Sequence, residues 1–124
     1  MHPTAFRSLV RRQARAWQTA DIETLLADFH PQSDFATPFG RCHGTEQIRR
    51  KAEHFFSSAL NTRIKILWSV FDGNRAAVEW TFTYQEKDTR RRLSFTDAIL
   101  IDVKEGKIHS WREYFDPRGI ETPT

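Results

Sequence analysis

The sequence contains a single cysteine, Cys42, among its 124 residues. One thiol cannot form an intrachain disulfide, and a cysteine-based metal site needs several thiolates. The five histidines show no pair at i, i+4 spacing with a third acid, the pattern typical of a zinc or iron site. We therefore expect no metal, and we expect a structural role for Cys42.

Glycine and long hydrophobic runs are also scarce. The five glycines form no Gly-rich loop of the kind that holds phosphates, so no nucleotide or other cofactor is implied. No apolar run approaches the length that spans a membrane. The start, Met1-His2-Pro3, lacks the charged and apolar segments of a signal peptide. The expected location is the cytoplasm, without a membrane partner.

The charge is positive but dispersed. Lysine and arginine outnumber the acids by 19 to 16, which gives a formal net charge of +3, and the basic clusters are interleaved with acidic residues. A protein that reads nucleic acid more often carries a concentrated basic stripe or a recognisable motif. We therefore expect no nucleic-acid partner.

Aromatic residues are abundant instead. Ten Phe, four Trp and two Tyr offset a modest hydrophobic share of 39%. Large rings bury much area per residue, so they can fill a core or line a cavity. The length allows one domain, 1–124, with one core.

The first half of the chain reads as helical. Apolar residues recur at helical spacing over Thr4–Thr19, and Asp21 offers an N-cap for a short second helix. Ser33–Thr37 reads as a short strand that ends before Pro38-Phe39-Gly40. Thr45 is the expected N-cap of a further helix that reaches about Ala59.

After Asn61 the pattern changes to that of strands. Four segments are rich in β-branched and aromatic residues and are separated by turn signals: Arg63–Phe71, Ala76–Gln85, Arg91–Val103 and Lys107–Phe115. Short loops force neighbouring strands to run antiparallel, so the four predict a meander. Helices followed by such a sheet indicate an α+β fold. Long antiparallel strands coil, and helices can close the concave face into a pocket.

Two acids fall on apolar faces of these strands. Asp97 alternates with Phe and Ile, and Glu113 shares its face with Trp111 and Phe115. An unpaired, ionised acid in such a place costs free energy, and desolvation raises its pKa toward values useful in catalysis. A position at a strand end or a pairing with arginine is the alternative for each acid.

Several segments, in order, resemble one family. They are Ala16-Trp17-Gln18-Thr19-Ala20-Asp21 with its following leucines, Gly44-Thr45-Glu46-Gln47-Ile48, and the closing Trp111-Arg112-Glu113-Tyr114-Phe115-Asp116. Together they resemble the SnoaL-like branch of the nuclear transport factor 2-like superfamily, from about Phe6 to Asp116. The resemblance implies a cone-shaped α+β barrel, with N-terminal helices packed on a curved antiparallel sheet. It also implies a homodimer formed through the outer sheet face.

The resemblance argues against two activities of that fold. Glu113 stands where limonene epoxide hydrolase carries a catalytic Asp, but Trp80 and Phe82 occupy the places of its other polar residues. Asp97 matches the protonated Asp of ketosteroid isomerase, a worked example of a neutral buried acid. Thr37 stands where that enzyme has its base, and its tyrosine is replaced by about Gln13.

Cyclase chemistry of the SnoaL type needs little more than one carboxylate acting as a base in an apolar pocket. We therefore expect a small apolar ligand and a cofactor-free cyclase- or isomerase-type reaction on a carbonyl compound. Glu113 and Asp97 are the candidate acid/base pair, in roles that the sequence leaves open. The residues expected to shape the site are Phe35, Thr37, Trp80, Phe82, Ile99, Trp111 and Phe115. The alternative is a non-catalytic ligand-binding or dimeric interaction module with the same cavity.

Overall fold

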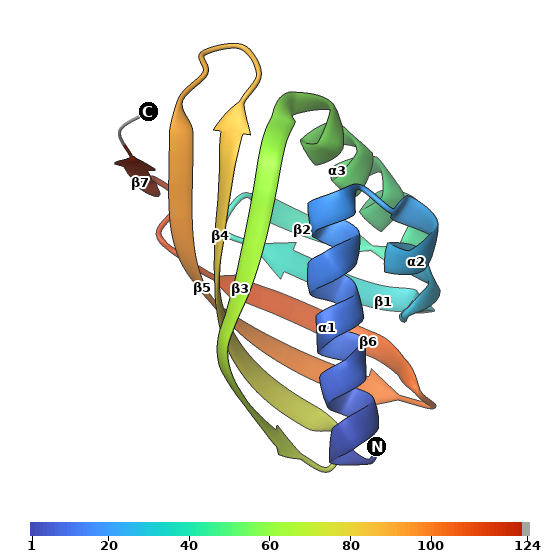
Figure 1. Cartoon of the computed structure of the whole chain (residues 1–124). Helices are drawn as coiled ribbons and strands as arrows, with labels where there is room; N and C mark the ends of the chain where they lie inside the picture. The colour runs from blue at the N-terminus through green and yellow to red at the C-terminus, as the bar shows by residue number, and fades with distance from the viewer. Residues whose placement is uncertain (123–124) are drawn as a thin grey trace.

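The computed structural model describes residues 1–122 (Figure 1). Its helices are α1 (Pro3–Thr19), α2 (Ile22–Ala27) and α3 (Gly44–Ser58). Its strands are β1 (Phe29–Thr37), β2 (Gly40–His43), β3 (Ala59–Asp72), β4 (Arg75–Glu86), β5 (Arg92–Lys104), β6 (Lys107–Tyr114) and β7 (Ile120–Thr122).

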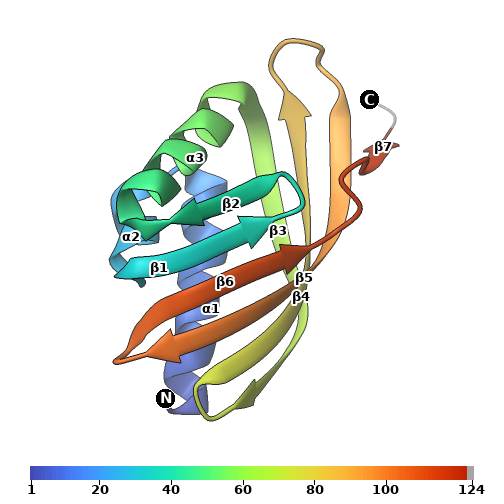
Figure 2. The ribbon, with the colours of Figure 1, turned by 180° about the vertical axis from the view of Figure 1, so that it is seen from behind.

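The strands form one mixed sheet in the order β2-β1-β6-β5-β4-β3, and β7 pairs with the start of β5. Strands β3 to β6 are the predicted antiparallel meander. Strand β1 joins it by running parallel to β6, and β2 pairs antiparallel with β1 (Figure 2). The hairpin turns fall at the predicted positions, where Gly73 and Gly106 adopt positive φ angles of 59° and 77°.

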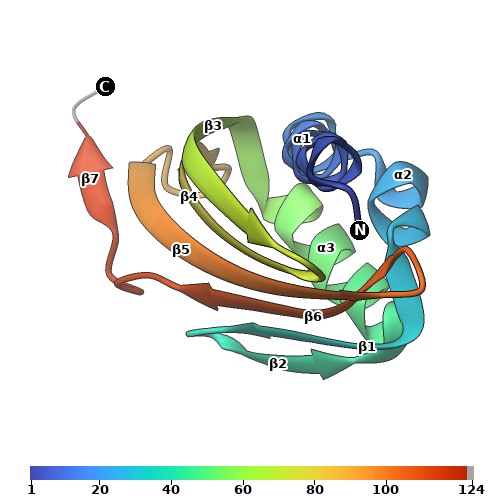
Figure 3. The same ribbon diagram turned by 90° about the horizontal axis from the view of Figure 1, so that it is seen from below.

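The sheet is strongly curved, and the helices lie on its concave side (Figure 3). Helix α1 packs on β3, and α3 packs on β1. The side chains between them form the core, whose fully buried large members include Phe6, Phe35, Ile48, Ile108 and Trp111. The predicted α+β architecture of helices on a curved antiparallel sheet is therefore confirmed.

Of the two N-cap residues predicted from the sequence, the structure confirms one. Asp21 caps α2 as predicted, since its Oδ1 accepts a hydrogen bond from the backbone N–H of Thr24 at 3.2 Å. The prediction of Thr45 as the cap of α3 is wrong, because the helix already begins at Gly44. The side chain of Gln47 reaches back instead and accepts from the backbone N–H of His43 at 2.8 Å.

Strand boundaries differ from the prediction mainly in β1. This strand starts at Phe29, four residues before the predicted start at Ser33, and runs through Pro31. Pro31 lies where the β1–β6 register shifts between Phe29 and Asp34, so its missing N–H interrupts no regular ladder. The short strands β2 and β7 were not predicted.

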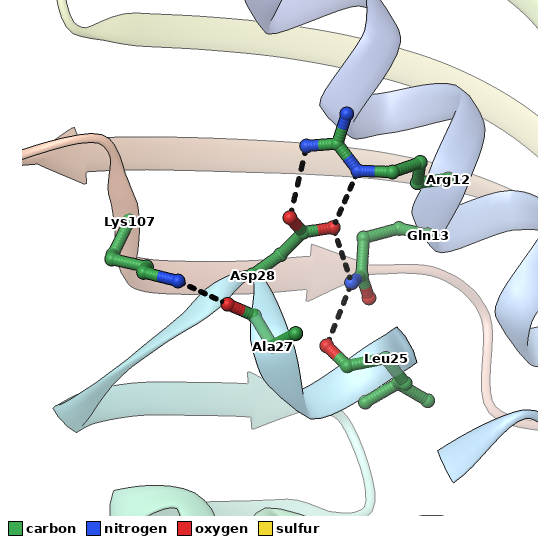
Figure 4. A network of polar contacts seen from close by, with 6 residues as sticks. All are labelled: Arg12, Gln13, Leu25, Ala27, Asp28 and Lys107. Atoms are coloured by element: carbon green, nitrogen blue, oxygen red, sulfur yellow. Dashed lines mark hydrogen bonds and ion pairs between the residues drawn. The ribbon is translucent and has the colours of Figure 1, made fainter. Parts of the chain in front are cut away.

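A buried polar network joins α1 to the end of α2 (Figure 4). Arg12 donates to both carboxylate oxygens of Asp28, at 2.9 and 3.3 Å. The fully buried Gln13 amide donates to Asp28 at 3.2 Å and to the backbone carbonyl of Leu25 at 2.9 Å. Lys107 closes the same region by donating to the carbonyl of Ala27. The network fixes α1 against the chain segment that leads into β1.

Replacing Asp28 by alanine is expected to lower the free energy of unfolding by about 2 kcal/mol. The change removes the shared acceptor of a guanidinium and a buried amide, and each loses a hydrogen bond. Urea denaturation measures the difference, with Asp88→Ala as a control in an exposed turn. Equal stability of the two variants would contradict the structural role of the network.

Candidate functional site

A cavity of about 120 Å³ lies between the concave face of the sheet and helices α1 and α3. Its wall is mostly aromatic. The rings that line it are Trp17, Phe35, Phe39, Phe55, Trp80, Phe82, Tyr84, Phe95 and Phe115, and the other lining residues are Thr37, Lys51, Thr62, Ile64 and Glu113. Such a wall suits an apolar, flat ligand with few polar groups.

The sheet side of the wall is built by the pairing of β4 with β5. Phe82 lies opposite Phe95, and their rings stack with centroids 4.7 Å apart and planes 11° apart. Phe115 meets both rings edge-on, at centroid distances of 5.6 Å from Phe82 and 5.3 Å from Phe95. These contacts hold the three rings in one arrangement at the cavity wall.

The helical side of the wall was not identified from the sequence. Trp17 comes from α1, while Lys51 and Phe55 come from α3 at i, i+4 spacing, which places them on one helix face. Trp17 approaches Phe55 edge-on at 6.0 Å. Helical periodicity marks a buried face, but it does not distinguish a residue that fills the core from one that borders a cavity.

Glu113 is the single acid among the described residues that line the cavity. Its Oε2 accepts a hydrogen bond of 2.8 Å from the indole N–H of Trp111, which lies on the same strand two residues earlier. Trp111 itself is completely buried and stacks on Phe35 with planes 3° apart. The indole thus holds the Glu113 carboxylate at the wall.

Asp97 lies behind this wall. On β5 it lies opposite Trp80 of β4. Glu113 of β6 lies opposite Ile99, two residues after Asp97 on β5, so both acids are on the same face of the sheet. The side chain is fully buried, and it does not line the cavity. Neither of its carboxylate oxygens has a hydrogen-bond donor within reach in good geometry, and the indole N–H of Trp80 is also without a partner.

The environment of Asp97 favours its neutral form. Burial, together with the hydrogen bonding and charge repulsion of the adjacent Glu113 carboxyl, raises the pKa of Asp97 from an ordinary 3.8 to about 11. The backbone of Tyr114 and the side chain of Trp80 lower the pKa by less. Two ionised carboxylates offer each other no donor, whereas a proton on Asp97 supplies an O–H that Glu113 can accept. Asp97 therefore keeps its proton at neutral pH.

The structure distributes the residues expected from the sequence between the wall and the core behind it. Phe35, Thr37, Trp80, Phe82, Phe115 and Glu113 line the cavity. Trp111 and Ile99 are completely buried and lie in the core, as does Asp97. The catalytic and binding roles of the lining residues stay predictions.

Within residues 1–122, no group of three or more His, Cys, Asp or Glu side chains is placed to bind a metal ion. None of the three helices in the same range combines the length and the apolar character needed to cross a membrane.

Replacing Asp97 by asparagine is expected to stabilise the protein at pH 8 by more than about 1 kcal/mol. The folded protein keeps the Asp97 proton, while the unfolded chain releases it above pH 3.8, so the wild type loses stability as pH rises from 3.8 toward 11. An amide is neutral at every pH, so the difference should vanish near pH 4.

Urea denaturation at pH 4, 6 and 8 measures this difference. Asp102→Asn is the matched control, because Asp102 lies on the same strand but pairs with Arg75 on the outer face at 3.0 Å. A wild type that is more stable than Asp97→Asn at pH 8 would show that the buried acid is ionised.

The fold is widespread among known structures. A protein with a ketosteroid isomerase-like fold from Catenulispora acidiphila, solved with trimethylamine, superposes with a TM-score of 0.84 at 18% identity, over 90% of this chain and 88% of that one. An LEH-like epoxide hydrolase from M. tuberculosis gives 0.81 at 22% identity, over 94% and 86%. TsrD from Streptomyces laurentii gives 0.86 at 17% identity, over 96% and 93%. At these identities the likeness concerns the fold alone.

No curated protein matches the sequence. The family model of the SnoaL-like domain, however, matches residues 10–111, which is most of the chain. The expected family is thereby confirmed: the chain belongs to the SnoaL-like domain family.

Proposed function

We propose that this protein is a cofactor-free acid/base enzyme that removes a proton from an acidic carbon of an apolar carbonyl compound, as in cyclase or isomerase reactions. The observation that carries the proposal is the pair of acids at an aromatic cavity. One acid, Glu113, is on the wall, and the other, Asp97, is buried beside it without any cation. Within residues 1–122, neither Asp97 nor Glu113 forms an ion pair.

In the proposed step, a Glu113 carboxylate oxygen takes the proton from the carbon next to the carbonyl group. The electron pair of the broken C–H bond moves toward the carbonyl oxygen, and an enolate forms. Glu113 then returns the proton to a different carbon. In a cyclisation the enolate instead attacks a second carbonyl within the same ligand, and the alkoxide that forms takes the proton back from Glu113. The aromatic wall keeps water away from the enolate.

Asp97 is a positioning residue in this scheme, because it does not reach the cavity. As long as it keeps its proton, it can donate a hydrogen bond to Glu113, while Trp111 donates a second one from its indole at 2.8 Å. These two donors orient the carboxylate toward the ligand. The sequence left the two roles open, and the structure favours Glu113 as the base.

Replacing Glu113 by glutamine is expected to remove catalysis while the fold stays intact. The amide oxygen can still accept from Trp111, but an amide cannot take a proton from carbon. The measurement is wash-in of deuterium from D₂O at the acidic carbon of aryl 1,3-diketones, followed by NMR. We expect the rate over background to fall by at least about 100-fold.

The matched control is Glu79→Gln. Glu79 accepts a hydrogen bond of 2.9 Å from the indole of Trp68, so it repeats the Glu–Trp pair on the outer face of the same sheet. Equal rates of deuterium exchange in wild type and Glu113→Gln would refute the assignment of Glu113 as the base. Binding of the diketones without exchange in any variant would support the alternative, a ligand-binding module.

We further propose that the outer sheet face forms a homodimer. An outer patch runs across four strands in two adjacent rows and consists of Trp68, Val70, Ala77, Ala98, Leu100 and Tyr114. Trp68, Val70 and Tyr114 are more than half exposed, which is unusual for a monomer surface when such residues are contiguous. A two-fold axis through the patch would bury both copies of it with one self-complementary contact.

Replacing Leu100 by lysine is expected to give monomers, because the new charge lies beside Arg112 at the centre of the outer patch and faces its own copy across the axis. Light scattering after size-exclusion chromatography should give twice 14.6 kDa for the wild type and one chain for the variant. Ile120→Lys, an exposed apolar residue on β7, is the control. A monomeric wild type would contradict the proposal.

A further inference from the structure

Lys51 is the one cation among the described residues that line the cavity. It lies on α3 one turn before Phe55, and its side chain is half-buried. The rest of the wall is aromatic apart from Thr37, Thr62, Ile64 and Glu113. No hydrogen bond or ion pair joins its ammonium group to any residue in the part of the chain that the structure describes.

The sequence of α3 explains why Lys51 lacks a counter-charge. Its neighbours on the helix face are three and four residues away: Gln47, Ile48, His54 and Phe55. None of these is acidic. The nearest acids on the helix, Glu46 and Glu53, are five and two residues away and so point elsewhere.

Glu113 does not supply the counter-charge either. It comes from β6, it accepts from Trp111, and its carboxylate is not within 4.0 Å of the Lys51 ammonium. The cavity therefore has two separate polar points, one acidic and one basic, on an apolar wall. A partly desolvated ammonium gains most from an anion that arrives together with an apolar body.

We propose that the ligand of this cavity is an aromatic carboxylate, whose carboxylate group binds Lys51 and whose ring lies against Phe82 and Phe95. The inference rests on the proposed function, since it uses the same cavity, and it adds the class of ligand and its orientation. The carboxylate is repelled by Glu113 and attracted by Lys51. The opposite end of the ligand, with the acidic carbon, is therefore directed toward the base. A cavity of about 120 Å³ suits a body of single-ring size.

The test compares two ligands of the same shape, trans-cinnamate and trans-cinnamamide, by isothermal titration calorimetry at neutral pH. Wild type should bind the carboxylate about tenfold tighter than the amide, because only the carboxylate forms a charge-assisted hydrogen bond with the ammonium. Lys51→Met keeps the length of the side chain and removes its charge. It should weaken cinnamate binding about tenfold and leave cinnamamide binding unchanged.

Arg50→Met is the matched control, since it removes the same charge from the adjacent, exposed position of α3. It should keep the preference of the wild type for cinnamate. Equal affinity of wild type for both ligands, or a preference that survives in Lys51→Met, would overturn the assignment of Lys51 and leave the acid/base proposal standing. No binding of either ligand would overturn both the ligand class and the cavity as an aromatic-ligand site.

Discussion

The uninterrupted pairing of β4 with β5 is the constraint on which the site depends. The two strands stay in register from Arg75–Asp102 to Gln85–Arg92 without a bulge, so every second residue of both strands faces the helices. The same register places Phe82 opposite Phe95 and Trp80 opposite Asp97. A shift by one residue would turn the rings to solvent and bring Thr81 and Thr83 into the core. The aromatic wall and the buried acid are thus two consequences of one pairing.

The same sheet carries two Glu–Trp hydrogen bonds in different surroundings. On the outer face, Trp68 donates to Glu79 at 2.9 Å, and both side chains are open to solvent. On the concave face, Trp111 donates to Glu113 at 2.8 Å, with Asp97 buried behind the pair. Burial of Asp97 opposes folding at neutral pH, since the folded state must keep a proton that water would accept. A group that costs stability in this way, beside a cavity, is typical of functional sites rather than of structural ones.

The sequence predicted the parts of this arrangement that depend on local chemistry. Alternation in the strands placed Trp80, Phe82, Asp97 and Glu113 on the concave face, and Asp21 identified the start of α2. It did not separate wall from core, because alternation fixes a face and not a depth, and so Trp111 and Ile99 were expected at the cavity. The sequence also did not identify Lys51 as a cavity residue, because the packing of α3 against β1 decides where that helix face points. Strand β2 has only four residues, too few for a period to be recognised.

Everything said of the acid pair depends on Asp97 keeping its proton at neutral pH beside Glu113, and NMR can observe the effect of that proton directly. The γ-carbon shifts of uniformly ¹³C-labelled aspartate residues are followed from pH 4 to pH 9, and the Asp97 signal is assigned by its absence in Asp97→Asn. We expect one γ-carbon to keep the shift of a protonated carboxyl group throughout this range. A signal that titrates near pH 4, like that of an exposed aspartate, would instead show that Asp97 is ionised.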